Sequence, residues 1–269
     1  VLALLWLHRG GLDLWGAWLG GLLALLIWSK ATAQDPAHWV RLLSPSALIA
    51  IAIGRIGSFA SGCDYGRIFS PQFALTRALS EHARWPSEVM ELSAGPPVWL
   101  AQVERQMLAA SSVVSLPTHP VQLYEASLVA AWLSIALLHF APGKAIIEQP
   151  RILLLGYSAI AFAAEWLRGD EDRGLIGPSL HGPLIVCLST VLFALSLGIA
   201  VRHLGLTVSR SIQAGVAFGF VYGAVTWPIG QLLQHAPEGG RLSLAQCAAL
   251  LMAAVCGFGA GKKVPQTVA

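Results

Sequence analysis

The sequence predicts an all-α protein, a polytopic transmembrane helix bundle of about seven helices with a small extracytoplasmic cap. Of 269 residues, 55% are hydrophobic and only 12% are charged, whereas soluble domains carry about 25% charged residues. The mean hydropathy is +0.65. Apolar runs long enough, or nearly long enough, to cross a bilayer alternate with polar segments. These runs cover residues 12–28, 43–60, 121–140, 152–167, 184–201, 212–233 and 244–259.

Glycines four residues apart occur in the first and sixth runs. They are Gly16 with Gly20, and Gly215 with Gly219 and Gly223. Small residues at this spacing let membrane helices approach closely, so we expect a packing role for them. Residues 1–7 are apolar but too short to span a bilayer. We expect them to be the tail of a longer helix and not a signal peptide.

The basic residues of the short loops predict the orientation. Alternate loops hold Lys30 with Arg41, Lys144 with Arg151, Arg202 with Arg210, and Lys262 with Lys263. Because loops rich in Lys and Arg stay inside, these loops and the C-terminus should be cytoplasmic. Residues 61–118 then form one long outer segment, in which we expect short helices over 73–91 and 98–108. This segment is interpreted as a cap over a membrane site, or as a loop without a chemical role.

Composition also argues against several classes of partner. The formal net charge is +3, with the charges spread between the apolar runs. Nucleic acid is therefore not an expected partner. The four cysteines form neither a disulfide framework nor a C-x-x-C metal motif. We predict no metal and no organic cofactor.

Three polar clusters are predicted to meet at one depth in the membrane. Arg55 and Glu165 each lie fourteen residues beyond a cytoplasmic arginine, which places both about 21 Å along their helices. In a hydrocarbon layer of about 30 Å they lie in its outer third. Tyr124 and Glu125 begin a helix that descends from the outer side, and Asp13 opens another at the same level. The polar groups should therefore converge.

An arginine in such a run is costly and usually faces an interior or a wet cavity. We expect the glycines Gly54, Gly57, Gly62 and Gly66 to end the helix next to Arg55 and free backbone N–H groups for an oxyanion. With Arg55 and Arg67 as cationic partners, this predicts a pocket for an anionic lipid headgroup.

The same residues also allow purely structural interpretations, without a lipid-binding pocket. Arg55 with Glu125 or Glu165 is then a structural ion pair, and His119 a cap or interfacial residue and not a base. His119, Gln122 and Glu125 are spaced three apart, so they share one side of a helix, and Glu165 with Arg168 has the same spacing. Cys63 is only a weak candidate nucleophile, because no sequence feature stabilises its thiolate.

These clusters resemble the signature blocks of the prolipoprotein diacylglyceryl transferases, a bacterial inner-membrane family. The matching segments are Gly54-Arg55-Ile56-Gly57 through Tyr65-Gly66-Arg67, then His119-Pro-Val-Gln-Leu-Tyr-Glu125, then Gly156-Tyr157 through Glu165-Trp-Leu-Arg168. The resemblance covers roughly residues 10–201 and not the helices after Ile212. It implies transfer of a diacylglyceryl group from phosphatidylglycerol to the cysteine thiol of a prolipoprotein lipobox segment.

The chain departs from the family pattern at several positions. Trp15 stands where the family has a histidine regarded as catalytic, and Ala161 stands where the third block normally carries arginine. Ser58 and Ser61 replace asparagines, and Cys63 stands where glutamate or cysteine is found. These departures keep a second hypothesis open: a non-catalytic relative that binds anionic phospholipid or a lipidated partner.

Residues and resemblance together give a set of expected site residues and a domain division. With the family histidine absent, His119 or Glu165 would serve as the base. The expected catalytic residues are Arg55, His119 and Glu165. The expected substrate-binding residues are Gly57, Ser58, Gly62, Gly66, Arg67, Gln122, Tyr124, Glu125 and Arg168. Residues 1–201 would form the transferase-like domain, and residues 202–269 an additional transmembrane hairpin.

Overall fold

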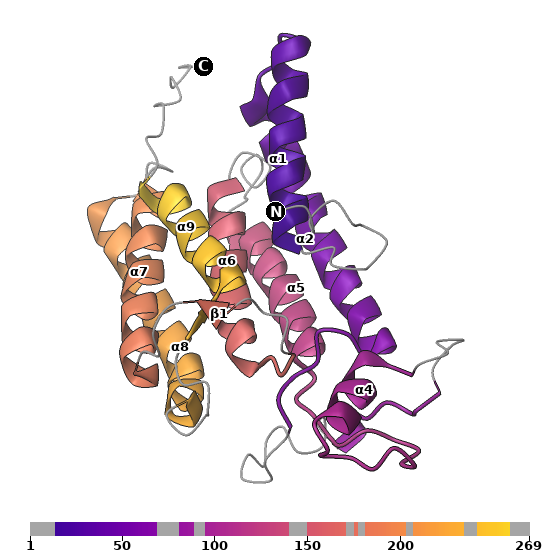
Figure 1. Ribbon diagram of the computed structural model, residues 1–269. Helices are drawn as coiled ribbons and strands as arrows, with labels where there is room; N and C mark the ends of the chain where they lie inside the picture. Colours follow the sequence, from indigo (N-terminus) through magenta and orange to yellow (C-terminus); the bar gives the residue numbers. More distant parts are fainter. Residues whose placement is uncertain are drawn as a thin grey trace.

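The computed structural model describes residues 14–68, 81–88, 95–139, 150–170, 175–176, 181–202, 207–233 and 241–258, so the expectations for residues 1–7 and for Asp13 fall outside it. The described residues form eight helices and two short strands (Figure 1). The helices are α1 (Leu14–Ala31), α2 (Pro36–Ser61), α4 (Pro97–Glu104), α5 (Val121–His139), α6 (Pro150–Leu167), α7 (Gly182–Arg202), α8 (Val208–Leu233) and α9 (Leu244–Phe258). The strands β1 (Leu175–Ile176) and β2 (Leu242–Ser243) pair antiparallel. The predicted all-helical class is confirmed, with this small ladder as an addition.

Helix α2 is longer at its start than the apolar run predicted. Asp35 is its N-cap, because its Oδ1 accepts a hydrogen bond from the Ala37 N–H at 3.0 Å. Pro36 follows at the first helical position, where proline is well tolerated. Arg41, expected in a loop, therefore lies inside the helix.

The end of α2 corrects one prediction. The helix runs without interruption to Ser61, so Gly54 and Gly57 do not end it and free no backbone N–H groups. Termination comes at Gly62, whose φ of 72° is left-handed. The Gly62 and Cys63 N–H groups donate back to Phe59 O at 3.2 Å and Ser58 O at 3.0 Å, the pattern of a Schellman cap.

The helices pack in the spatial order α2, α5, α6, α9, α7 and α8. Figure 1 shows α2 and α5 on one side, α7 and α8 on the other, with α6 and α9 between them. A continuous core joins these helices, with Phe162 of α6, Phe193 of α7 and Ala253 of α9 fully or almost fully buried. Helix α1 touches mainly α2, where Trp28 and Trp39 meet edge to face with ring centroids 5.1 Å apart.

Close backbone approach joins α7 and α8. A Cβ added at Gly215 would lie 2.7 Å from the Ala194 carbonyl oxygen, and one at Gly219 would lie 2.9 Å from the Ala194 Cβ. The packing role expected for these α8 glycines is confirmed. For Gly16 and Gly20 of α1 the packing role stays a prediction, since a Cβ at either position meets nothing within 4 Å among the described residues.

The segment between α2 and α5 has its own small core. Trp85, Ala83 and Val98 are buried against Tyr65 and Phe59, and Trp85 Nε1 donates to the Phe59 carbonyl oxygen at 2.6 Å. In Figure 1 this segment lies below the lower ends of α2 and α5. Helix α4 confirms the start of the helix expected over 98–108, but it ends at Glu104, and residues 105–108 are not helical.

The other helix expected in this segment, over 73–91, is confirmed at residues 81–82 and is wrong from residue 83 to residue 88. Residues 83–88 are not helical, because Pro86 pairs with Val114 in an isolated bridge. The parts of 73–91 at 73–80 and 89–91 lie outside the described residues.

Three described helical stretches are long and apolar enough to cross a membrane by length and composition. They are Pro36–Ser61, Gly182–Arg202 and Val208–Ile229. Shorter apolar stretches occur at Gly20–Ala31, Val121–Leu137 and Leu244–Gly257. Large apolar side chains on the outer faces, such as Phe220 and Val216 of α8, are exposed, as they would be against lipid tails.

Candidate functional site

The loop after α2 is held between the start of α5 and the end of α6. The Gly169 N–H donates to Tyr65 O at 2.9 Å, and the Arg67 N–H donates to Leu167 O at 2.8 Å. On the other side, the His119 N–H donates to Arg67 O at 2.9 Å. The loop thus brings the first sequence block against the second and the third.

Gly66 is required where this loop meets α5. A Cβ at this position would lie 2.2 Å from the His119 carbonyl oxygen and 2.7 Å from a Val121 methyl group. A side chain would therefore push the loop away from the His119–Val121 segment. Because Gly66 has no side chain, the loop after α2 can pack closely against the start of α5 while it also bonds to the end of α6.

Arg55 of α2 faces two carboxylates from different parts of the chain. Its Nη1 donates to Asp64 Oδ2 at 2.8 Å, and its Nε lies 2.8 Å from Glu125 Oε2 of α5. Glu125 is almost completely buried. An unpaired charge at this place would be expensive, so each group stabilises the other.

Arg168, just beyond α6, faces three carboxylates. Its Nη2 lies 2.8 Å from Asp64 Oδ1, and its Nη1 lies 3.4 Å from Glu165 Oε2. Its Nε donates to Asp170 Oδ1 at 2.9 Å, and its Nη2 contacts Asp170 Oδ2. Burial alone would lower the pKa of Arg168, but the bond to Asp170 and the charge of Glu165 raise it above its usual value.

One carboxylate connects the two guanidinium groups. Asp64 gives one oxygen to Arg55 and the other to Arg168, each at 2.8 Å. The chain of ion pairs therefore runs from Glu125 through Arg55, Asp64 and Arg168 to Glu165. The convergence predicted from helix length is confirmed for Arg55, Glu125 and Glu165.

The remaining expected site residues lie around this network in different ways. Gln122 is buried, and its Nε2 donates to the Cys63 carbonyl oxygen at 2.5 Å. Arg67 Nε donates to the Trp166 carbonyl oxygen at 3.1 Å, so this guanidinium joins the loop to α6. Tyr124 lies beside His119, with ring centroids 6.4 Å apart.

Gly57, Ser58 and Gly62 belong to the last turns and the cap of α2. Gly57 lies on an exposed side of the helix, and a Cβ there meets nothing within 4 Å among the described residues. The Ser58 carbonyl accepts the capping bond from the Cys63 N–H. Their predicted contact with substrate stays a prediction.

His119 is buried just before α5 begins, where its backbone N–H bonds to Arg67 of the loop. Burial lowers the pKa of its imidazole below the usual value of 6.5. The ring is therefore neutral at pH 7 and able to accept a proton.

Two members of the network were missed from the sequence. Asp64 lies inside the first block, where it reads as a solvent-exposed turn residue, and its role depends on the loop returning to α6. Asp170 lies two residues beyond Arg168. A usable signal was available, because a carboxylate in an apolar chain is costly unless it is paired, and each of these two lies close to an arginine in the sequence.

The departures from the family pattern have structural positions as well. The backbone of Trp15 lies in the first turn of α1, while Ala161 is half-buried within α6. Cys63 is a free, half-buried thiol next to Asp64. Within the described residues, no group of three His, Cys, Asp or Glu side chains is arranged to hold a metal ion.

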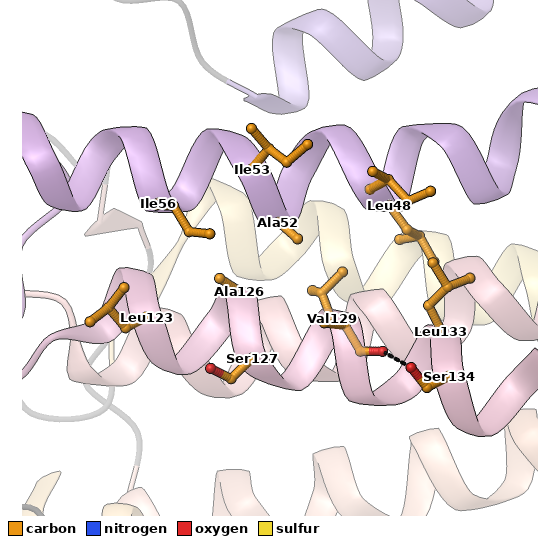
Figure 2. A pocket seen from close by; sticks show the side chains of 12 residues that line it. Leu48, Ala52, Ile53, Ile56, Leu123, Ala126, Ser127, Val129, Leu133 and Ser134 are labelled. Atoms are coloured by element: carbon orange, nitrogen blue, oxygen red, sulfur yellow. Dashed lines mark hydrogen bonds between the residues drawn. The ribbon is translucent and has the colours of Figure 1, made fainter.

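An apolar groove of about 420 Å³ runs between α2 and α5 (Figure 2). Ile53 and Ile56 line it from α2, and Leu123, Val129 and Leu133 line it from α5. Neither Arg55 nor Glu125 belongs to its lining. The groove therefore offers mainly hydrocarbon surface, and its polar side chains are Ser127 and Ser134 of α5.

Comparison with known proteins agrees with this arrangement. The family model for prolipoprotein diacylglyceryl transferases matches residues 1–205. The chain belongs to this family. All three polar blocks lie within the matched region, and α8 and α9 lie beyond it.

Curated relatives include the phosphatidylglycerol–prolipoprotein diacylglyceryl transferase of Burkholderia mallei. It is 30% identical over 203 residues, which cover 66% of this chain and 62% of the relative. The protein of the same name from Burkholderia lata is 29% identical over 174 residues, covering 61% of this chain and 54% of the relative. The chain thus spans between about half and two thirds of the length of these relatives.

Proposed function

We propose that this membrane protein transfers a diacylglyceryl group from phosphatidylglycerol to the cysteine thiol of a prolipoprotein. The single observation that carries the proposal is the pair of guanidinium groups, Arg55 and Arg168, fixed around one anion position at the ends of α2 and α6. Family membership gives the reaction class, because the curated relatives carry that activity in their names.

In this proposal the two arginines bind the lipid phosphate. Guanidinium groups suit this role because they stay charged and offer several donors to phosphate oxygens. Arg55 would also stabilise the negative charge on the leaving glycerol phosphate. The other proposed substrate-binding residues are Gly57, Ser58, Gly62, Gly66, Arg67, Gln122, Tyr124 and Glu125.

The proposed reaction is a displacement at the glyceryl carbon that carries the phosphate. A base takes the thiol proton, the sulfur attacks this carbon, and a thioether bond forms. The carbon–oxygen bond to phosphate breaks, and the electron pair leaves with glycerol phosphate. Arg55 and Arg168 would stabilise this developing charge in a site that is largely shielded from water.

His119 is the better of the two proposed bases. Burial lowers the pKa of its imidazole below 6.5, which favours the neutral, proton-accepting form. Glu165 lies 3.4 Å from Arg168 and already shares in the ion-pair network. Taking up a proton there would weaken that pair, so we assign Glu165 to holding Arg168 during the reaction.

The proposed setting is the bacterial inner membrane, with several membrane passes and a cytoplasmic C-terminus. The segment 61–118 would then lie outside as a cap, and the charged network would lie near the outer headgroups. Residues 1–201 would form the transferase domain. The additional hairpin, 202–269, would support it by packing α9 against α6 and α7.

A second candidate function is binding of anionic phospholipid or a lipidated partner without catalysis. It is favoured by Trp15 and Ala161, which occupy positions where the family pattern has histidine and arginine. The same two guanidinium groups would then hold the phosphate without a following chemical step.

A transfer assay separates the two candidates. The purified protein in phosphatidylglycerol nanodiscs is incubated with a lipobox peptide, and the product is followed by mass spectrometry. We expect a peptide heavier by one diacylglyceryl group, and none with Arg55→Gln. Normal phosphatidylglycerol binding without any such product would favour the second candidate.

A further inference from the structure

We propose that Asp64 competes with the lipid phosphate for Arg55 and Arg168: its carboxylate bridges the two guanidinium groups and leaves when a phosphodiester binds. This inference rests on the proposed lipid-binding function. It adds a residue that sets how tightly an anionic headgroup is held.

The geometry of the bridge supports this exchange. Asp64 Oδ2 lies 2.8 Å from Arg55 Nη1, and Oδ1 lies 2.8 Å from Arg168 Nη2. A phosphodiester also presents two oxygens that share one negative charge. It can therefore take the same two places with the arginines where they are.

The charge balance of the network favours replacement over addition. Across the ion pairs of the described residues, two guanidinium groups face four carboxylates: Glu125, Asp64, Glu165 and Asp170. A phosphodiester added to this set would place a fifth anionic group beside the same two guanidinium groups. If it replaces one carboxylate, the charge at the arginines stays the same.

Asp64 is the carboxylate that can leave with the least penalty. Its side chain is 31% exposed, against 17% for Asp170, 6% for Glu165 and 3% for Glu125. Water can therefore solvate the freed Asp64 carboxylate, while a freed Glu125 would be a buried, unpaired charge.

The backbone allows this movement without unfolding the loop. The carbonyl before Asp64 accepts a bond from Gln122 at 2.5 Å, and the Tyr65 carbonyl accepts one from Gly169 at 2.9 Å. Both flanking residues are thus anchored. Rotation about the Asp64 side-chain bonds is enough to move its carboxylate away from the arginines.

The test compares Asp64→Asn with the matched control Asp170→Asn. Both remove one carboxylate from Arg168, but only the first removes the bridge to Arg55. Asparagine suits the left-handed backbone at position 64, where φ is 53°. Binding is measured in detergent micelles by titrating phosphatidylglycerol, with diacylglycerol as a ligand that lacks the phosphate.

We expect Asp64→Asn to bind phosphatidylglycerol about tenfold more tightly, with diacylglycerol binding unchanged and without a comparable gain in Asp170→Asn. Unchanged or weaker binding by Asp64→Asn would overturn the proposal, as would equal tightening in both variants. Failure of wild type and variant alike to bind phosphatidylglycerol would overturn it together with the lipid site. Tighter binding without transfer to a peptide would leave this inference standing and reject the transferase.

A measurement on the wild-type protein covers the case in which the variant does not fold. Carbodiimide with an amine nucleophile labels carboxylates that water can reach, and mass spectrometry locates the label. Adding phosphatidylglycerol should increase labelling at Asp64 and not at Glu125. Labelling of Asp64 that stays constant or falls would contradict the exchange.

Discussion

Arg55 and Glu125 form an ion pair between α2 and α5, with Arg55 Nε 2.8 Å from Glu125 Oε2 and the carboxylate 3% exposed. The pair joins two helices at the level of the proposed lipid phosphate. Its contribution to stability can be separated from its proposed contribution to lipid binding. The single and double variants below should differ in stability, while both should lose binding.

Arg55→Gln should destabilise the protein by about 3–5 kcal/mol, because it leaves the Glu125 carboxylate buried without its partner. The double variant Arg55→Gln/Glu125→Gln should recover most of this loss, since no buried charge remains. Both should lose phosphatidylglycerol binding. Unfolding in detergent followed by tryptophan fluorescence measures the first effect, and lipid titration the second. A single variant as stable as wild type would show that the pair is not buried as described.

Gly66→Ala should destabilise the protein by about 1–3 kcal/mol or more, because the added Cβ would lie 2.2 Å from the His119 carbonyl oxygen. The matched control is Gly54→Ala, where a Cβ meets nothing within 4 Å among the described residues. That change should be neutral or stabilising by up to about 1 kcal/mol, because alanine favours the helix. Equal melting temperatures for the two variants would contradict the close contact between the loop and His119.

If His119 is the base, the transfer rate should fall on the acid side as pH drops through the lowered pKa of this ring. The fall should begin below pH 6.5, because burial holds the pKa of His119 under that usual value. The measurement is kcat/KM for a lipobox peptide between pH 5 and 8. His119→Gln should be slow throughout and lack this acid limb. An acid limb that persists in the variant would point to another base.

The same shift predicts a pH-dependent stability. His119 is neutral in the folded protein, and between its folded pKa and 6.5 the unfolded chain binds more protons. Its stabilising contribution is therefore complete above pH 6.5 and is lost as pH falls toward the folded pKa. The loss of melting temperature between pH 7 and 5.5 should be smaller in His119→Gln.

Ending the chain after residue 206 should lower the melting temperature in detergent by several degrees or prevent recovery of folded protein. Helix α9 buries Ala249 and Ala253 in the same core as Phe162 and Phe193, and Gln246 Nε2 donates to the Phe162 carbonyl oxygen at 3.3 Å. Removing α9 leaves α6 and α7 without these contacts. A shortened chain as stable as the full one would support residues 1–201 as an independent domain.

Hydropathy predicted the long helices within a few residues, because in a membrane the apolar run and the helix have nearly the same extent. It failed at the start of α2, where residues 36–42 include His38 and Arg41 and continue the helix beyond the apolar run. The capping pair Asp35-Pro36 was the signal that could have corrected this.

The sequence predicted those site residues whose depth in the membrane follows from their position along a helix. These are Arg55, Glu125 and Glu165. Asp64 could not be predicted in the same way, because a loop bound to both α5 and α6 determines its position. The non-helical residues 83–88 were missed for a similar reason, because Pro86 pairs with a distant segment. Their partner, Val114, lies far along the chain, and local sequence does not report such pairing.

The left-handed backbone at Asp64 restricts which amino acids suit this position. Glycine and asparagine adopt a φ of 53° readily but bring no charge, whereas glutamate brings the charge with a backbone penalty of about 1 kcal/mol. Aspartate alone combines a short acidic side chain with tolerance of this turn. Asp64→Asn is therefore the mildest available substitution for altering the proposed affinity of the protein for anionic phospholipid.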